Sequence, residues 1–174
     1  ISIERIAAEF LRIINSPTPM QGVIFLEKLG LIDYILPEIK AAIGCEQGGI
    51  HAYDVYEHLL RSLQAAADKG YSPELRLAAL LHDIGKPPTR RTGGKNKEYS
   101  FFGHEVVGAR MTREILARLK LPRDFSDRVE TLVRWHMFFS DPDEITLAAV
   151  RRTIVRVGED HIEDLLNLRV CDRI

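Results

Sequence analysis

Apolar residues recur along most of the chain at the three- and four-residue spacing of an α-helix, and the runs stop at glycine and proline. Ahead of the second run, Thr18 and Gln21 stand in the Thr-x-x-Gln arrangement of a capping box, and Gly30 closes that run. The alternating pattern of a β-strand is weak throughout, and residues 99–102 are its best candidate. The spacing therefore predicts an all-α fold. Helices are expected over residues 3–14, 19–29, 53–69, 73–84, 104–119, 124–138, 143–157 and 159–174, with a further turn of helix from Pro37.

The helix predicted over residues 73–84 differs from the others because it is apolar on every side after Arg76, the pattern of a buried helix. Ser72 is placed to cap it, and Gly85 stops it. A histidine and an aspartate, His82-Asp83, therefore lie at its inner end. An ionised carboxylate in such a place costs several kcal/mol unless a positive group meets it. Since the helix carries no Lys or Arg after Arg76, we expect a metal ion as the partner.

Two stretches lack helical periodicity. Residues 44–50 contain three glycines and form the plausible internal boundary, so we expect a small helical segment over residues 1–44 and a second domain over 45–174. The second domain ends within a helical pattern, which indicates truncation at its C-terminus and a fragment of a longer protein. Residues 87–103 form the longest stretch without periodicity, and a loop of that length is usually functional or mobile.

Composition narrows the class of protein. A net charge of −1 gives no global attraction to nucleic acid, so such binding has to come from local patches. The two cysteines, Cys45 and Cys171, are far apart, which argues against a disulfide framework and a cysteine-based zinc site and favours a reducing cytoplasm. No apolar run approaches the ~20 residues of a membrane span, so no membrane partner is expected.

Four further polar residues lie in helical, apolar surroundings, and the three histidines among them each have an ordinary structural explanation. His58 could be a hydrogen-bonded core histidine, His104 could cap a first turn, and His136 could meet a helix dipole. Asp172 is a carboxylate in apolar company. Taken together with His82-Asp83, they are imidazoles and carboxylates at inward positions, the way helical bundles assemble metal sites.

The order His58, then His82-Asp83, then Asp172 resembles the HD-domain metal-dependent phosphohydrolases. His104 and His136 match the two additional histidines of the binuclear members of that family. The resemblance implies an HD-domain helical bundle with two adjoining metal positions that share one carboxylate. Its implied ligands are His58, His82, Asp83 and Asp172 for the first metal, and Asp83, His104 and His136 for the second.

Longer segments indicate a branch of this family. Residues 51–58, 75–89 and 101–108 closely resemble the HD domain fused to bacterial tRNA nucleotidyltransferases and poly(A) polymerases, and residues 4–39 resemble the RNA-binding neck and body region before it. The resemblance implies action on phosphate esters such as 2′,3′-cyclic nucleotides and 2′-phosphates, with a nucleotide, an RNA 3′ end or tRNA as partner. The nucleotidyltransferase head, with paired aspartates on a strand, is not found in the sequence. Nucleotidyl transfer is therefore not expected.

The ligand types suit one or two divalent ions of Mn, Fe, Ni, Co, Zn or Mg. Such an ion lowers the pKa of its bound water from 15.7 toward about 7 and so supplies a nucleophile. Asp83 and Lys86 are the expected catalytic residues, with Lys86 stabilising charge on phosphate. The open alternative is that Lys86 is simply a solvated lysine and that the loop after it is simply a solvated loop without a binding role. The expected substrate-binding residues are Lys86, Arg90, Arg91 and His51, supported by Lys95 and Lys97 of a basic loop that suits a polyanion.

Two functions remain open from the sequence. The first is a metal-dependent phosphohydrolase acting on cyclic or terminal phosphates of nucleotides or RNA. The second is a non-catalytic RNA-binding body whose metal only holds helices together, because metal ligation can supply folding energy outright.

Overall fold

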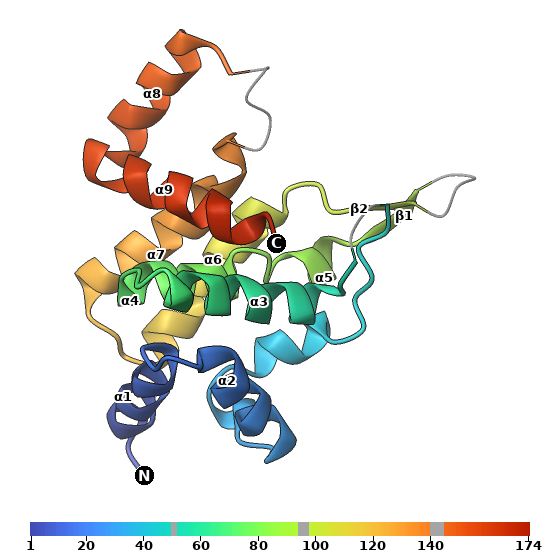
Figure 1. Ribbon diagram of the computed structural model, residues 1–174, viewed down its shortest axis with the longest axis vertical. Helices are drawn as coiled ribbons and strands as arrows, with labels where there is room; N and C mark the ends of the chain where they lie inside the picture. The colour runs from blue at the N-terminus through green and yellow to red at the C-terminus, as the bar shows by residue number, and fades with distance from the viewer. Residues whose placement is uncertain (50–51, 94–97, 140–144) are drawn as a thin grey trace.

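The computed structural model describes residues 1–49, 52–93, 98–139 and 145–174, and the regular structure of these residues is almost entirely helical, as the sequence predicts (Figure 1). No helix of this described part is long and apolar enough to cross a membrane. The α-helices are α1 (Ile3–Ile14), α2 (Pro19–Lys28), α3 (Val55–Asp68), α4 (Pro73–Leu81), α5 (Lys86–Thr89), α6 (His104–Arg118), α7 (Arg123–Trp135), α8 (Leu147–Val157) and α9 (Glu159–Asp172). Short 3₁₀ turns are η1 (Ile32–Tyr34), η2 (Pro37–Ala42) and η3 (His136–Phe139), and β1 (Arg91–Gly93) pairs with β2 (Glu98–Ser100).

Helix α4 lies at the centre of the bundle and packs against α3, α7, α9 and α1. All of its residues from Leu77 to Leu81 are buried, which explains why the sequence is apolar on every side here. Ser72 Oγ accepts a hydrogen bond from Leu75 N at 3.3 Å, and the predicted start of the helix is confirmed. In Figure 1, α1 and α2 lie below the layer that contains α3 and α4, and α8 and α9 lie above it.

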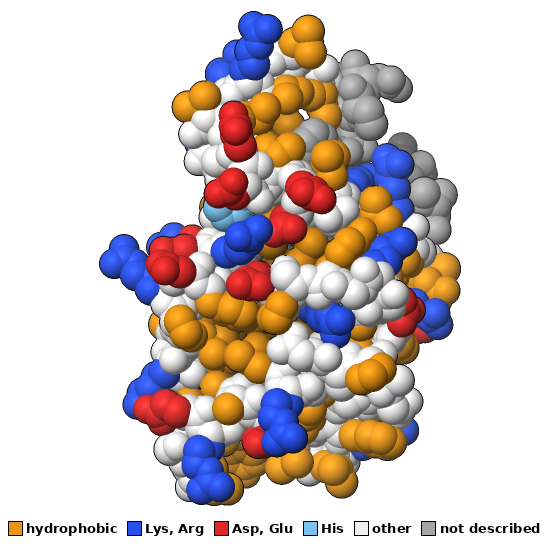
Figure 2. Space-filling view, turned by 60° about the vertical axis from the view of Figure 1, so that its left-hand side comes forward, with side chains coloured by type: hydrophobic (Ala, Val, Ile, Leu, Met, Phe, Trp, Pro, Cys, Tyr) orange, Lys and Arg blue, Asp and Glu red, His pale blue; other side chains and the backbone are white. Residues whose placement is uncertain are grey.

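The first two helices join the same hydrophobic core as the rest of the bundle, which runs from Ala7 to Cys171. The Arg76 guanidinium donates to Ile14 O at 3.3 Å and to Ser16 O at 3.1 Å, so it ties the end of α1 to α4. The division of the chain at residue 44 stays a prediction. Figure 2 shows side chains of both charge signs interspersed on one face, in keeping with a net charge near zero.

The predicted capping box of the second helix is wrong. Thr18 starts α2 without a side-chain hydrogen bond to the helix. Gln64 of α3 takes that role, since its Oε1 accepts from Met20 N at 3.4 Å and its Nε2 donates to Pro17 O at 2.9 Å. A partner 44 residues away along the chain replaces the local one. By contrast, Asp54 Oδ1 accepts from Glu57 N at 2.8 Å and caps α3.

Residues 87–103, predicted to be a loop, carry regular structure in their described part. Helix α5 is followed by the antiparallel pair β1 and β2, in which Thr92 faces Tyr99. The weak strand candidate at residues 99–102 therefore marks a real strand, but β2 ends at Ser100. Lys95 and Lys97 lie outside the described residues, as do residues 140–144. Helix α8 begins at Leu147 rather than at the predicted residue 143, because Thr146 is extended and caps it, with Thr146 Oγ1 accepting from Ala149 N at 3.1 Å.

Candidate metal centre

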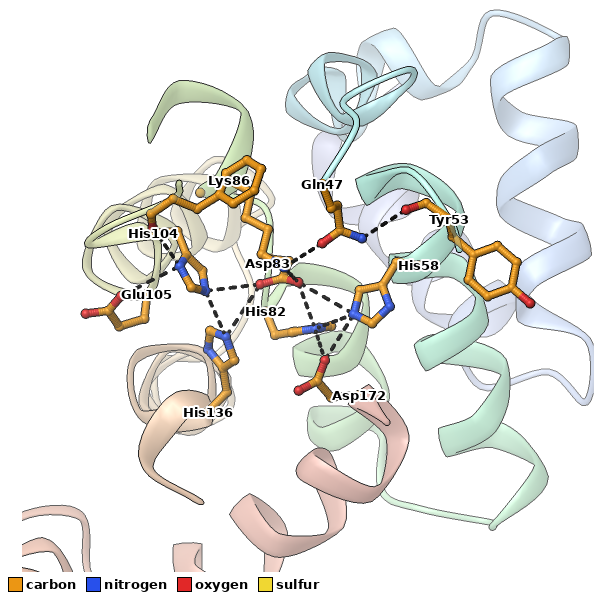
Figure 3. A network of polar contacts seen from close by, with 12 residues as sticks. Gln47, Tyr53, His58, His82, Asp83, Lys86, His104, Glu105, His136 and Asp172 are labelled. Carbon is orange, nitrogen blue, oxygen red and sulfur yellow. Dashed lines mark hydrogen bonds and ion pairs between the residues drawn. The ribbon is translucent and has the colours of Figure 1, made fainter. Parts of the chain in front are cut away.

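Six side chains from five parts of the bundle converge on one buried point (Figure 3). Each comes from the end of a helix or from a helix that crosses α4. Three histidines are 0% to 5% exposed and the central carboxylate is 2% exposed, so the cluster is closed to bulk water on most sides. The residues are His58 of α3, His82 and Asp83 at the end of α4, His104 at the start of α6, His136 at the end of α7 and Asp172 at the end of α9.

One half of the cluster combines two imidazoles with two carboxylates. His58 Nε2 lies 3.0 Å from Asp172 Oδ1 and 3.2 Å from His82 Nε2. His82 Nε2 lies 3.3 Å from Asp172 Oδ1. The Oδ2 atom of Asp83 completes the group, 3.5 Å from His58 Nε2 and 3.4 Å from His82 Nε2.

The other half uses the second oxygen of the same carboxylate. Asp83 Oδ1 lies 3.2 Å from His104 Nε2 and 3.5 Å from His136 Nε2. The two imidazole nitrogens are 3.2 Å apart. Figure 3 shows His104 and His136 on one side of Asp83 and His58 with Asp172 on the other. Asp83 therefore stands between two groups of ligand atoms and presents one oxygen to each.

The histidine rings are held by backbone carbonyls three residues earlier. His82 Nδ1 lies 2.8 Å from Ala79 O, and His136 Nδ1 lies 2.7 Å from Val133 O. These carbonyls belong to the last turns of α4 and α7, which lack partners within their own helices. Likewise, His104 Nδ1 lies 2.9 Å from Phe101 O. Because a carbonyl only accepts, each Nδ1 carries a proton, so in the neutral ring the Nε2 lone pair faces the cluster.

This arrangement fits metal binding. The Nε2 atoms of His104 and His136, 3.2 Å apart, would repel one another as neutral acceptors unless a cation lies between them. Neighbouring ligand atoms spaced 3.0 to 3.5 Å apart can each reach a common ion at the ~2.0–2.2 Å typical of imidazole and carboxylate ligands. Mixed nitrogen and oxygen donors suit divalent first-row metals.

The electrostatics of the metal-free cluster show how strongly it attracts a cation. Burial lowers the pKa of His82, but the carboxylates of Asp83 and Asp172 outweigh it and raise that pKa to about 10. Burial raises the pKa of Asp172, yet contact with His58 and His82 brings it far below its usual range. For His136, by contrast, burial dominates and lowers the pKa. A protonated His82 thus takes the place of a metal cation between two carboxylates.

The sequence predicts a metal ion as the positive partner of Asp83, and the structure adds a second cation from the protein. Lys86 Nζ lies 2.6 Å from Asp83 Oδ2. The same ammonium group donates to Gln47 Oε1 at 2.7 Å, and Gln47 Nε2 donates to Tyr53 O at 3.1 Å. Gln47 is 5% exposed and sits in the glycine-rich break, where no sequence pattern marks it.

Glycine makes the close approach of the two halves possible. A Cβ atom at Gly85 would lie 2.2 Å from His104 O and 2.6 Å from Gly108 N. The turn that follows Asp83 therefore packs directly on the first turn of α6, and this contact sets the separation between Asp83 and His104.

A cavity of about 500 Å³ opens beside the cluster, with Asp83, His104, His136 and Asp172 among its lining residues. Its wall also contains Lys86, and Arg169, which is ion-paired with Asp172. Sequence reasoning missed Arg169 and the rim residues Phe102, Glu105 and Met137. Of the predicted substrate-binding residues other than Lys86, Arg90 and Arg91 are not among those that line this cavity, and Arg90 stacks on Tyr99 with 3.8 Å from Cζ to the ring centroid. His51 lies outside the described residues.

Comparison with known proteins places this geometry in a family. Residues 55–173 match the model of the HD domain, and residues 1–43 match the model described as the probable RNA and SrmB-binding site of polymerase A. The chain is similar to the A-adding tRNA nucleotidyltransferase of Deinococcus radiodurans, with 38% identity over 172 residues, which cover 98% of this chain and 39% of that protein.

Two further relatives agree. The CC-adding tRNA nucleotidyltransferase of Thermus thermophilus is 38% identical over 98% of this chain and 39% of its own length. The multifunctional CCA protein of Neisseria meningitidis is 29% identical over 97% of this chain and 41% of its own length. The chain thus spans about two fifths of the length of these relatives. With the match over residues 55–173 and the cluster of histidines and aspartates that can hold metal, the chain belongs to the HD-domain family, of the type found together with the RNA-binding region of tRNA nucleotidyltransferases.

Proposed function

We propose that the protein is a metal-dependent phosphohydrolase acting on cyclic or terminal phosphate esters of nucleotides or RNA, as part of a protein similar to the tRNA nucleotidyltransferases. The observation that carries this proposal is the position of Asp83, whose Oδ1 faces His104 and whose Oδ2 faces His82. A carboxylate shared between two ligand groups suits a pair of divalent ions. When bound, two such ions would supply a nucleophile from water at neutral pH and polarise a phosphoryl oxygen.

The remaining residues of the cavity suit the binding of a phosphate ester. Lys86 and Arg169 place positive charge on the cavity wall, where phosphate oxygens require it. The Nε2 ligand atoms of His82, His104 and His136 are held in place, because the Nδ1 atom of each ring is hydrogen-bonded to a backbone carbonyl. The floor of the cavity is buried, so competing bulk water is excluded from most of the cluster.

The test is hydrolysis of bis(p-nitrophenyl) phosphate and of adenosine 2′,3′-cyclic phosphate by protein loaded with Mn²⁺, Ni²⁺ or Co²⁺. We expect turnover in the wild type and its loss in Asp83→Asn, together with a fall in bound metal. Asp127→Asn serves as the control, since Asp127 is an exposed carboxylate of α7 paired with Arg123. Wild-type rates in Asp83→Asn would rule out this mechanism.

The second candidate is an RNA-binding body with a structural metal site. It is favoured by the match of residues 1–43 to an RNA-binding region and by the origin of the cluster in α3, α4, α6, α7 and α9, which a metal would cross-link. A chelator separates the two functions, with helicity followed by circular dichroism. Loss of turnover with helicity kept supports the hydrolase, whereas unfolding without any prior turnover supports the scaffold. RNA binding through residues 1–44 should weaken steeply with salt.

A further inference from the structure

Phe102 is an aromatic side chain in an unusual position. It is 97% exposed, yet it lines the cavity that contains the metal cluster. Met137, which directly follows His136, is 40% exposed and lines the same cavity. The neighbouring Phe101 also lines the cavity, but it is partly buried and packs against the hydrophobic core. Single exposed apolar residues are common on protein surfaces, but two at the mouth of one charged cavity form an apolar rim.

The position of Phe102 is tied to the metal cluster by a tight turn. Phe101 O accepts hydrogen bonds from His104 N at 3.1 Å and from His104 Nδ1 at 2.9 Å. Gly103 has φ 78° and ψ 11°, the values of the third residue of a type II turn, which few other residues adopt. Phe102 is therefore the second residue of a four-residue turn whose last residue is a candidate metal ligand. The turn therefore fixes the position of the Phe102 Cα relative to the metal cluster.

The cavity has a charged floor and an apolar rim, which suit the phosphate and the base of a nucleotide. Its floor carries Asp83, His104 and Asp172 with the cations of Lys86 and Arg169, which suits metal ions and a phosphate. Its rim offers an aromatic face and a polarisable thioether, the surfaces on which nucleobases stack. Glu105 also lines the cavity, and its carboxylate can accept hydrogen bonds from the amino groups of bases. A volume of about 500 Å³ is in the range of small-ligand sites.

We propose that Phe102, together with Met137, binds the base of a nucleotide whose phosphate lies at the metal cluster. The inference rests on the proposed function for the position of the phosphate, but it concerns a separate property, the contribution of the base to affinity. Phe102 acts here as a specificity-determining residue. Its side chain is almost fully solvent-exposed, so its removal leaves the packing of the bundle unchanged.

The test compares two ligands that differ only in the base. Calorimetry on the metal-loaded protein measures the affinity for a phosphonate analogue of AMP, which cannot be hydrolysed, and for the matching ribose phosphonate. We expect Phe102→Ala to weaken binding of the AMP analogue by roughly fivefold or more, the lower end of the effect of losing one stacked base. Binding of the ribose phosphonate should not change. Phe102→Tyr should retain the affinity, and Val155→Ala, which shortens an 87% exposed apolar side chain of α8, should alter neither ligand.

The inference is overturned if Phe102→Ala affects both ligands equally or affects neither, or if the wild type does not prefer the ligand with a base. Its failure can be told from failure of the proposed function. Phosphodiester hydrolysis with no base-dependent binding removes the inference alone. Base-dependent binding lost in Phe102→Ala, in a protein without hydrolytic activity, supports the inference and removes the hydrolase.

Discussion

Lys86 Nζ lies 2.6 Å from Asp83 Oδ2, so the carboxylate at the centre of the cluster is held by an ammonium group three residues further along the chain. The lysine is held in turn by Gln47, and its side chain is only 11% exposed. A cation in this place has two opposing effects. It keeps a buried carboxylate ionised, and it competes with a metal ion for the same oxygen.

Replacing this lysine should therefore separate metal binding from turnover. We expect Lys86→Met to bind divalent metal at least as tightly as the wild type, because the competing ammonium is gone. Turnover of a phosphodiester should nevertheless fall by roughly 10²-fold, the usual effect of removing one preorganised group that stabilises charge in the transition state. Metal content measured by mass spectrometry and initial rates on the same samples provide the comparison. A parallel loss of metal and activity would instead assign Lys86 to holding the ligands.

Stability of the metal-free protein should depend on pH through His82. Its pKa is about 10 in the folded protein against 6.5 in an unfolded chain, so the folded state binds more protons between these values. The stabilisation is fully present below pH 6.5 and is lost as pH rises through 10. Urea denaturation in the presence of a chelator should show this decline, and His82→Gln should abolish it.

With metal bound, the dependence should reverse. His82 Nε2 then carries no proton in the folded state, so the unfolded chain binds more protons below about pH 6.5. Stability of the loaded protein should rise with pH up to that value. The same denaturation series without chelator gives the measurement, and identical profiles for the two forms would contradict binding at His82.

The two halves of the cluster should lose metal independently. Among the carboxylate oxygens of the described residues, His136 contacts only Asp83 Oδ1, on the side shared with His104. We expect His136→Ala to keep the metal held by His58, His82, Asp83 and Asp172 and to lose the other. Asp83→Ala should lower both occupancies, because each ligand group contains this residue. Metal-to-protein ratios after dialysis decide the matter, and a single ion in the wild type would contradict the paired arrangement.

Much of this site is predictable from the sequence, in part from helical periodicity and in part from the resemblance to the HD-domain family, which implies the full ligand set. His82 and Asp83 follow a helix that is apolar all round, and no surface helix has that pattern. The partners that depend on distant contacts could not be found in this way. Gln47 lies in a glycine-rich break, and nothing local indicates that its amide meets Lys86.

Of the two paired strands, the sequence indicates only the second, as the weak candidate at residues 99–102. Strands β1 and β2 have only three residues each, too few for an alternating pattern. Backbone pairing and the stacking of Arg90 on Tyr99 hold them instead. Similarly, Gln64 of α3 caps α2 from another helix, whereas the sequence pattern predicts a local capping box.

A substitution at Gly85 tests how closely the turn after Asp83 packs against α6. An added methyl group would meet His104 O at 2.2 Å, so Gly85→Ala has to move α6 away from α4. We expect a loss of roughly 1–3 kcal/mol in the free energy of unfolding and weaker metal binding at the His104 side. Gly108→Ala is the matched control, since a Cβ there would meet its neighbours no closer than 3.4 Å. Thermal melts and metal titrations of both variants distinguish a local clash from a general intolerance of alanine.

The hydrogen bonds from histidine rings to the last carbonyls of α4 and α7 have a consequence for assembly. The end of its own helix fixes the orientation of each ring, so folding alone turns the Nε2 atoms of His82 and His136 inward before an ion binds. The metal site is therefore preorganised, and binding of an ion requires little rearrangement of the ligand side chains. Exchange of one divalent metal for another should accordingly leave the backbone in place. Which metal is bound then depends on the metals available in the cell.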